Sequence, residues 1–268
     1  MNDNRKLGGG NRDLGEDEIL LVDKPAGVSS FGVVARVRRK LSEEAGYIEM
    51  KGKDGVVRQK RKKVKVGHTG TLDPFATGLL ILLVGKGTKR ANEFLKLDKE
   101  YIATVRLGEV STTGDPEGEV VASTEADLTD ERFRDKIPER IVTEKPNKEA
   151  VEKCVENFVG ENWQTVPAFS AVKINGQRAY KLAREGKQVE MPRRKVQIYE
   201  IEVLDYKWPD LTIRCRVSSG TYIRALGEDI GKALGTGAYL MALRRTQVGE
   251  YRVEEAEKGA VVFDLTTF

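Results

Sequence analysis

Residues 67–78 read Gly-His-Thr-Gly-Thr-Leu-Asp-Pro-Phe-Ala-Thr-Gly and lead directly into the apolar run from Leu79 to Val84. This run is long enough for a buried strand and far too short to span a membrane. Asp73 precedes Pro74, so an extended backbone is favoured over a helical one at the aspartate. A carboxylate on a stiff loop beside a core strand is typical of a catalytic group, but a structural turn with Asp73 as a cap predicts the same pattern. The loop alone leaves both interpretations open.

Length and composition indicate one large globular domain, or one domain with a small appendage. The chain has 268 residues, 39% hydrophobic and 33% charged, which is enough apolar material for a core. Its two cysteines, Cys154 and Cys215, lie far apart at apolar positions and predict core residues in a reducing compartment. With His68 as the only histidine, a zinc site is disfavoured. We find no secretory signal and expect a cytoplasmic protein.

Positive charge is concentrated in one segment. Lys51 to Lys65 holds eight Lys/Arg and one Asp, a net charge of +7, whereas the whole chain carries +4 and the remainder therefore −3. Such a basic run often contacts nucleic-acid phosphates. A solvated hairpin or loose loop, suggested by Gly52 and Asp54-Gly55, explains it equally well.

Hydrophobic periodicity predicts an α+β fold with a largely antiparallel, mixed central sheet flanked by helices and loops. Helices are expected from Ser29 or Ser30 to residue 41, over 148–159 with Gly160 as the stop, over 221–234 and over 238–245. Strands are expected at residues 19–22, 79–84, 101–107, 196–206 and 211–217. In the last strand, apolar residues alternate with Thr212, Arg214 and Arg216, which predicts one buried face and one basic, solvated face.

Common cofactor motifs are absent from the sequence. In Gly85-Lys86-Gly87-Thr88-Lys89 the lysine is followed by glycine, so a phosphate-binding loop is not predicted. No GxSxG elbow and no dinucleotide fingerprint occur. What remains is a single carboxylate with basic and aromatic residues nearby in sequence.

Several blocks in order carry a family resemblance. The core Gly-His-Thr-Gly-x-Leu-Asp-Pro, the Asp23-Lys24-Pro25 segment, Asp98 to Tyr101, Val166 to Lys173, Ser219 to Arg224 and Leu243 to Arg245 resemble motifs of the TruB family of tRNA pseudouridine synthases. These blocks run from about residue 19 to about residue 253, so the resemblance covers most of the chain. It implies the pseudouridine synthase fold and a catalytic domain over residues 18–254. Residues 1–17 are polar, Gly-rich and charged, which predicts a flexible tail.

The resemblance implies isomerisation of the T-loop uridine at position 55 of tRNA to pseudouridine, without a metal, nucleotide or redox cofactor. Asp73 matches the essential aspartate, which attacks the sugar, attacks the base or removes a sugar proton; the sequence does not choose among these. Arg224 matches the arginine that pairs with this aspartate and keeps it ionised. From the residues alone, an exposed helix arginine facing Glu228 is the simpler interpretation. Tyr101 matches the tyrosine that stacks on the target base, and its alternative is a core aromatic residue.

The resemblance also implies an RNA-binding surface. His68 matches the residue that fills the RNA stack after the target base has been turned out, and Leu243 matches an apolar pocket wall. Arg178, Lys181 and Arg184 recur every three residues, which predicts one basic helical face; a solvated surface is the alternative. The full set of expected RNA contacts is His68, Lys89, Lys173, Arg178, Lys181, Arg184, Arg193, Arg194, Tyr222 and Leu243.

The chain departs from the family pattern in three places. Residues 43–64 form a basic insertion, for which we expect additional phosphate contacts. Residues 167–195 match the family's RNA-binding thumb. The second departure is at the C-terminus, where residues 255–268 are expected to be a short tail in place of a PUA domain. Ser111 to Thr113 stand where relatives often carry an aspartate. The expected partner is tRNA, through its T-arm, with a monomeric protein and no membrane; a non-catalytic RNA-binding or tRNA-folding module is the alternative function.

Overall fold

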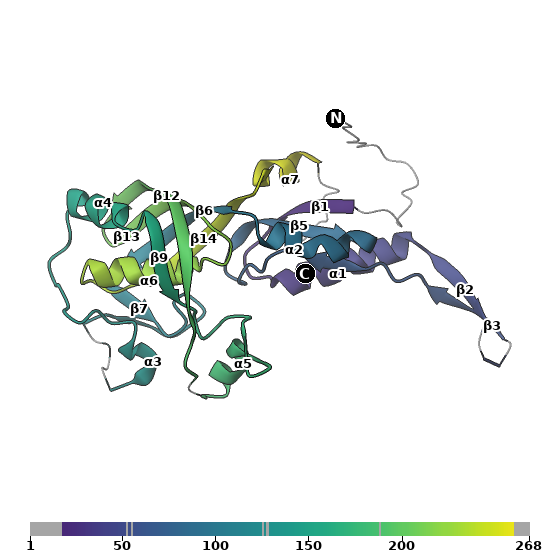
Figure 1. Cartoon of the computed structure of the whole chain (residues 1–268), viewed down its shortest axis with the longest axis horizontal. Helices are drawn as coiled ribbons and strands as arrows, with labels where there is room; N and C mark the ends of the chain where they lie inside the picture. Colours follow the sequence, from purple (N-terminus) through teal and green to yellow (C-terminus); the bar gives the residue numbers. More distant parts are fainter. Residues whose placement is uncertain are drawn as a thin grey trace. The chain divides into compact units, whose positions relative to one another are not determined.

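The computed structural model describes residues 18–51, 53–54, 56–124, 126, 129–187 and 189–259 (Figure 1). Two compact units divide the chain: unit 1 comprises residues up to Leu97 and from Gln247 onward, and unit 2 comprises Asp98–Thr246. The expected N-terminal tail, residues 260–268 and the hairpin glycines Gly52 and Gly55 lie outside the described residues. No helix within the described ranges is both long and apolar enough to cross a bilayer.

Unit 1 is built around two central antiparallel strands. Its elements are β1 (Glu18–Lys24), α1 (Ser30–Glu44), β2 (Tyr47–Lys51), β3 (Val57–Arg61), β4 (Val66–His68), β5 (Thr77–Val84), the 3-10 helix η1 (Gly85–Arg90), α2 (Ala91–Leu95), β15 (Tyr251–Arg252) and α7 (Val253–Gly259). β1 and β4 both pair with β5 in antiparallel register.

The strand predicted after the loop of residues 67–78 is confirmed as β5, and both faces of this strand are buried against helices. Leu80, Leu82 and Val84 pack with Val33, Val34, Val37 and Leu41 of α1. Leu79, Ile81 and Leu83 pack with Phe94 of α2 and with Val253 and Ala256 of α7. An unbroken apolar run is therefore required here, since an alternating strand would place polar side chains in one of the two cores.

α1 begins where the sequence predicts. The Ser29 side chain accepts a hydrogen bond from the Gly32 N–H, and the predicted apolar face, from Val33 to Leu41, is buried. Two consecutive serines therefore act differently: Ser29 caps the helix, whereas the side chain of the buried Ser30 can form hydrogen bonds with the neighbouring loop.

Unit 2 contains a larger sheet with helices. Its elements are β6 (Lys99–Leu107), β7 (Glu109–Ser111), β8 (Val120–Ala122), α3 (Glu131–Arg134), α4 (Lys148–Glu156), β9 (Gly160–Thr165), β10 (Lys173–Ile174), β11 (Gln177–Arg178), α5 (Ala179–Arg184), β12 (Arg193–Lys207), β13 (Asp210–Val217), α6 (Ile223–Ala233) and β14 (Ala238–Val248), whose last two residues belong to unit 1. Its sheet has the order β14-β6-β13-β12-β9. β13 pairs with β6 and β12, and β12 with β9, all antiparallel.

Alternation in β6 and β13 confirms the predicted one-sided sheet. Leu211, Ile213, Cys215 and Val217 are fully buried, whereas Arg214 and Arg216 are exposed. The amphipathic helix α6 buries Ile223, Leu226 and Ile230. Both cysteines are free thiols. The α+β class expected from the sequence is confirmed.

The prediction of a helix at 238–245 is wrong, because these residues form β14. The Ala/Leu/Met/Arg composition has high helical propensity, but Ala238, Tyr239 and Leu240 are all buried in a strand beside β6. Gly235 and Gly237, both with positive φ, separate this strand from α6. Tertiary pairing therefore overrides local propensity here. The helix predicted over 148–159 also ends earlier, at Glu156.

Candidate active site

The backbone on the N-terminal side of Asp73 is fixed by a buried serine. Ser30 Oγ donates to the Leu72 carbonyl and accepts from the Leu72 N–H, both at 2.8 Å. Ser30 is 2% exposed and Leu72 3%, so water does not compete strongly for either hydrogen bond. One side chain thus satisfies both polar groups of the residue that precedes the aspartate.

The backbone on the C-terminal side is fixed by a buried lysine. Lys24 Nζ donates to the carbonyls of Pro25 and Val28, both at 2.8 Å, and of Pro74, at 3.1 Å. The Pro74 carbonyl also accepts from the Gly27 N–H at 2.8 Å. Lys24 has 0% exposure, so its ammonium is satisfied by carbonyl oxygens within the protein.

Asp73 therefore lies between two anchored residues in the loop that leads into the buried strand β5. Its own carbonyl accepts from the Ala76 N–H at 3.1 Å, which closes a tight turn around Pro74. The side chain is half-buried. A carboxylate on a loop immobilised in this way can be aimed at a substrate without a further ordering cost.

His68 ends β4, opposite Leu82 of β5. The Gly70 N–H approaches His68 Nδ1 at 3.4 Å, and the Thr69 N–H donates to the Ile81 carbonyl at 3.1 Å. His68 as a whole residue is half-buried. This placement suits an aromatic side chain that inserts into a partner.

Arg224 is a buried residue in the first turn of α6. Its Nη1 lies 3.2 Å from Asp115 Oδ2, with side-chain exposures of 6% and 4%, and Nη1 and Nη2 also donate to the carbonyls of Thr113 and Phe169. The simpler interpretation, an exposed helix arginine, is wrong, and Glu228 instead accepts from Lys136 at 2.7 Å. A buried guanidinium requires such a partner set, because an isolated buried charge is strongly unfavourable.

The start of α6 is held by Gln164 of β9. Its side-chain amide accepts from the Tyr222 N–H at 3.1 Å and donates to the Tyr222 carbonyl at 3.3 Å, and Gln164 is only 2% exposed. Arg194 stacks over the Tyr222 ring at 5.2 Å and donates to the Gly220 carbonyl. The helix thus begins at a defined place although Tyr222 provides no side-chain cap.

Tyr101 and Leu243 lie on the strands β6 and β14 of the same unit and are 8% and 9% exposed. Lys99, two residues before Tyr101, is 7% exposed. Burial lowers the pKa of Lys99 to about 8, and repulsion from the Arg245 charge adds to this effect. The Asp98 charge acts in the opposite direction and raises the pKa. A lysine with this pKa is partly neutral near physiological pH.

The expected RNA-binding cations are mostly exposed. These are Lys89 on η1, Lys173, Arg178, Lys181 and Arg184 around α5, and Arg193 on β12, whereas Arg194 is half-buried. The expectation of one helical face is wrong for Arg178, which precedes α5 and donates to the Ala171 carbonyl at 2.6 Å. The short helix starts only at Ala179, so Lys181 and Arg184 alone share a helical face.

The three residues expected to be catalytic divide between the units. Asp73 belongs to unit 1, whereas Tyr101 and Arg224 belong to unit 2. Pairing of Asp73 with Arg224 stays a prediction. The sequence reasoning overlooked the residues that position these side chains: Lys24, Ser30, Asp115 and Gln164. Lys24 and Ser30 carried a signal, because both stand in the block of residues 23–30 that resembles the family's first motif.

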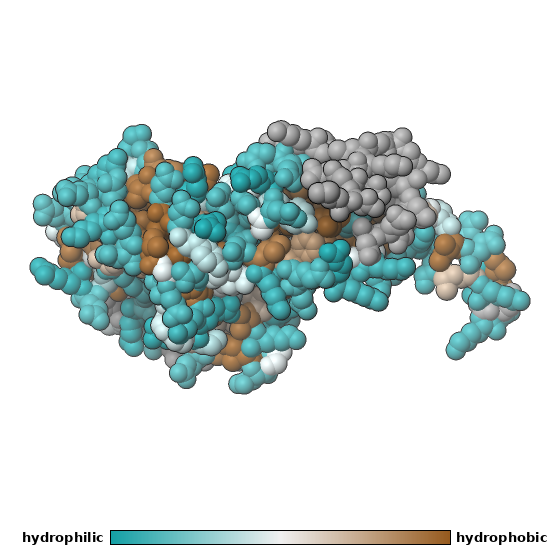
Figure 2. All heavy atoms as spheres, turned by 45° about the horizontal axis from the view of Figure 1, so that its top comes forward, coloured by the Kyte–Doolittle hydropathy of each residue, from teal (hydrophilic) through white to brown (hydrophobic). Residues whose placement is uncertain are grey.

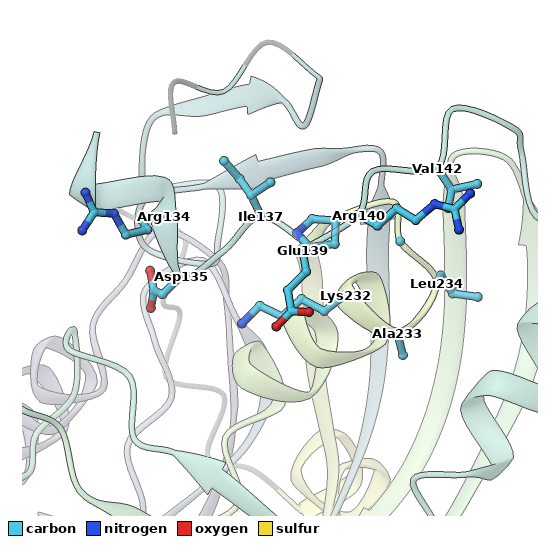
Figure 3. A pocket seen from close by; sticks show the side chains of 11 residues that line it. Arg134, Asp135, Ile137, Glu139, Arg140, Val142, Lys232, Ala233 and Leu234 are labelled. Atoms are coloured by element: carbon cyan, nitrogen blue, oxygen red, sulfur yellow. The ribbon is translucent and has the colours of Figure 1, made fainter. Parts of the chain in front are cut away.

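A hollow of about 710 Å³ in unit 2 lies away from these residues, between residues 134–142 and the end of α6 (Figure 3). Arg134 and Arg140 extend in opposite directions in Figure 3. The lining therefore presents no convergent set of charges and is not a second candidate site.

The matches to known proteins cover the same parts of the sequence that carry the family resemblance. Residues 58–223 match the N-terminal domain model of the TruB family pseudouridylate synthases, and residues 224–262 match the tRNA pseudouridylate synthase B C-terminal domain. A tRNA pseudouridine synthase B of Bacteroides fragilis is 43% identical over 240 residues, 90% of each chain. One of Phocaeicola vulgatus is 42% identical over 90% of this chain and 89% of its own.

Solved structures of longer proteins share the fold. A chain in a crystal structure of a Cbf5–Nop10–Gar1 complex matches with a TM-score of 0.58 at 27% identity, over 89% of this chain and 50% of that chain. A chain in an H/ACA RNP bound to a substrate RNA containing 2′-deoxyuridine matches with a TM-score of 0.54 at 25% identity, over 87% of this chain and 48% of that chain. This chain therefore corresponds to about half of each of these two.

Proposed function

The chain belongs to the TruB family of pseudouridylate synthases, and on this premise we propose that it isomerises the uridine at position 55, in the T-loop of tRNA, to pseudouridine. Its relatives named tRNA pseudouridine synthase B match it over nine-tenths of its length. We further propose that it acts as a monomer and that the T-arm is the part of tRNA it binds.

The reaction exchanges one bond for another. The glycosidic bond between N1 and C1′ breaks, the uracil rotates, and a bond forms between C5 and C1′. The proton on C5 is lost and N1 regains one, so no atom or electron is gained or lost overall. The protein must therefore hold a detached base and supply an ionised group at the sugar or the base.

The observation that carries the proposal is the double anchoring of the Asp73 loop. Ser30 fixes Leu72 and Lys24 fixes Pro74, so the aspartate between them has little freedom of backbone. A structural turn on the surface would not need a fully buried lysine beneath it. The Asp73 carboxylate either attacks the sugar, attacks the base or removes a sugar proton, and all three roles require it to be ionised.

Arg224 is proposed to keep Asp73 ionised, and Asp115 to hold Arg224 in place. A carboxylate that loses water on substrate binding gains protons more readily, and a nearby guanidinium opposes this change. Tyr101 is proposed to stack on the extruded uracil, and His68 to occupy the space that the base leaves in the RNA. Extrusion costs a few kcal/mol, of which stacking on an aromatic ring recovers a part.

The test uses a tRNA transcript and maps pseudouridine by position. We expect product at position 55 with the wild-type protein, none with Asp73→Asn, and unchanged product with Asp205→Asn, which alters an exposed aspartate of β12. Tight binding without any product in the wild type would select the non-catalytic alternative. Product at another uridine would overturn the assignment of the T-loop, and light scattering measures the oligomeric state.

A further inference from the structure

Strands β2 and β3 form a two-stranded ribbon, the basic hairpin (residues 47–61). Among the described residues it pairs with no other strand, and it contacts α1 at its base through the ion pair of Arg61 with Glu43. Every residue of both strands is exposed. Figure 1 draws the ribbon as a projection that leaves the C-terminal end of α1. A strand of five residues spans about 17 Å, so the ribbon is long enough to reach along a macromolecular partner.

The base of the basic hairpin is fixed firmly to unit 1. The Lys62 N–H donates to the Gly46 carbonyl at 2.9 Å, which closes the ribbon. The Val64 N–H donates to Ser42 Oγ at 3.1 Å, and the Val64 side chain is buried against α1. Two residues later the chain enters β4, which carries His68. An isolated hairpin is marginally stable in water, and these contacts supply the missing support.

The register of the ribbon places a cation opposite each apolar side chain. The cross-strand pairs are Tyr47 with Arg61, Ile48 with Lys60, Met50 with Arg58 and Lys51 with Val57. Directly opposed residues share a face, so neither face offers an uninterrupted apolar stripe. The long stems of lysine and arginine can cover these apolar neighbours and leave the charged ends outermost. Figure 2 shows hydrophobic and hydrophilic residues side by side on this projection.

Few of these charges are neutralised within the protein. Arg58 pairs with Asp54, and Arg61 pairs with Glu43 at 3.4 Å, both in exposed positions. Among the residues that the structure describes, Lys51, Lys53 and Lys60 of the hairpin have no ion pair. Unneutralised cations on both faces of a projecting ribbon are complementary to a polyanion.

We propose that the basic hairpin is an arm that binds the sugar–phosphate backbone of double-helical RNA next to the catalytic loop, and that it sets RNA affinity and not the rate of the chemical step. This inference rests on the proposed function, which supplies an RNA substrate. Proteins that bind single strands stack successive bases on several aromatic side chains, whereas this ribbon offers only Tyr47. Double-helical RNA is recognised mainly through its shape and its phosphates, which matches a ribbon of cations.

The test compares two sets of three lysines. Lys51→Gln, Lys53→Gln and Lys60→Gln together remove unpaired charges from the arm. The control replaces Lys148, Lys153 and Lys207 of unit 2 by Gln, so the net charge changes equally at exposed positions. The probes are a tRNA transcript, a blunt RNA duplex of about 16 base pairs and an oligouridylate of equal length, all titrated over a range of salt concentrations.

For the arm variant, we expect the slope of log Kd against log salt to fall by about two to three for tRNA and the duplex. At moderate salt the Kd for tRNA should rise about tenfold, with KM rising and kcat at saturating tRNA unchanged. The control set and the oligouridylate should show little change. Equal slopes for the two sets of variants, or equal losses for duplex and single strand, would overturn the proposal.

Two further variants keep the outcome clear. Deletion of residues 47–61, with Gly46 joined to Lys62 through Asn-Gly, should reproduce the loss of affinity, because those ends already share a backbone hydrogen bond. If Ile48→Ser with Met50→Ser dissociates an oligomer and leaves the salt slope unchanged, the ribbon is a self-association surface and the proposal is wrong. If the wild-type protein makes no pseudouridine, the proposed function is wrong. The proposal for the arm is still tested separately by the binding of the RNA duplex.

Discussion

Replacing Lys24 by Met tests whether a buried ammonium positions the catalytic loop. Methionine has nearly the same length and is apolar, so the change removes the charge and three hydrogen bonds to the carbonyls of Pro25, Val28 and Pro74. The Pro74 carbonyl keeps its bond from the Gly27 N–H, while Pro25 and Val28 lose this donor. The perturbation is therefore confined to the anchor.

The magnitude follows from the burial of these groups. A buried acceptor that loses its donor costs about 1–3 kcal/mol, and two such carbonyls would cost about 2–6 kcal/mol. Removal of a buried charge offsets part of this cost. We expect the free energy of unfolding in urea to fall by about 2–4 kcal/mol.

Activity should fall as well, because Asp73 lies next to the released Pro74. A misplacement of about 1 Å at a reacting group can cost about a hundredfold in rate, so we expect kcat for pseudouridine formation to fall by about ten- to a hundredfold. The control is Lys96→Met, which changes an exposed lysine of the same unit and should shift stability by less than about 0.5 kcal/mol. If Lys24→Met keeps full activity and its free energy of unfolding lies within about 1 kcal/mol of the wild-type value, Lys24 does not position the loop.

Three further substitutions probe other parts of the site. Asp115→Asn removes the Asp115 charge beside the buried Arg224, so stability should fall by about 2–4 kcal/mol and kcat should drop; Glu119→Gln, at an exposed position, is the control, and equal effects would refute the assigned role. Lys99 has a pKa lowered to about 8 in the folded state, so the unfolded chain binds more protons above that pH and stability should rise from pH 8 to 10; Lys99→Met should lose this rise in urea titrations. His68→Phe should keep more activity than His68→Ala, because stacking and not proton transfer is needed; two equally inactive variants would contradict this.

Local sequence patterns were sufficient for much of the fold. α1 was predictable because its cap, Ser29, and its apolar face are both encoded within one segment. β13 was predictable because one of its faces is buried and the other solvated, which leaves a period of two in the sequence. β14 was not, since residues 238–245 favour a helix by composition and become a strand only through pairing with distant residues.

The supporting residues of the site were harder to predict than the reactive ones. Asp73 stands in a loop with an unusual sequence, and Arg224 is the last residue of a recognisable block. Asp115 contacts Arg224, 224 − 115 = 109 positions further along the chain, and Gln164 contacts Tyr222, 58 positions further along. No local sequence pattern therefore predicts them. Burial decides their importance, because a polar group without water must find its partner within the protein.

The complete burial of Lys24 allows the opening of this part of the protein to be measured. Its primary amine has no solvent exposure and is engaged by three carbonyl groups, so an acylating reagent cannot reach it while the strand and the loop stay together. Its labelling rate, compared with that of Lys96, would then report how often this part of the protein opens and at what free-energy cost. A bound substrate that steadies the loop should slow the reaction at Lys24 and leave Lys96 unaffected.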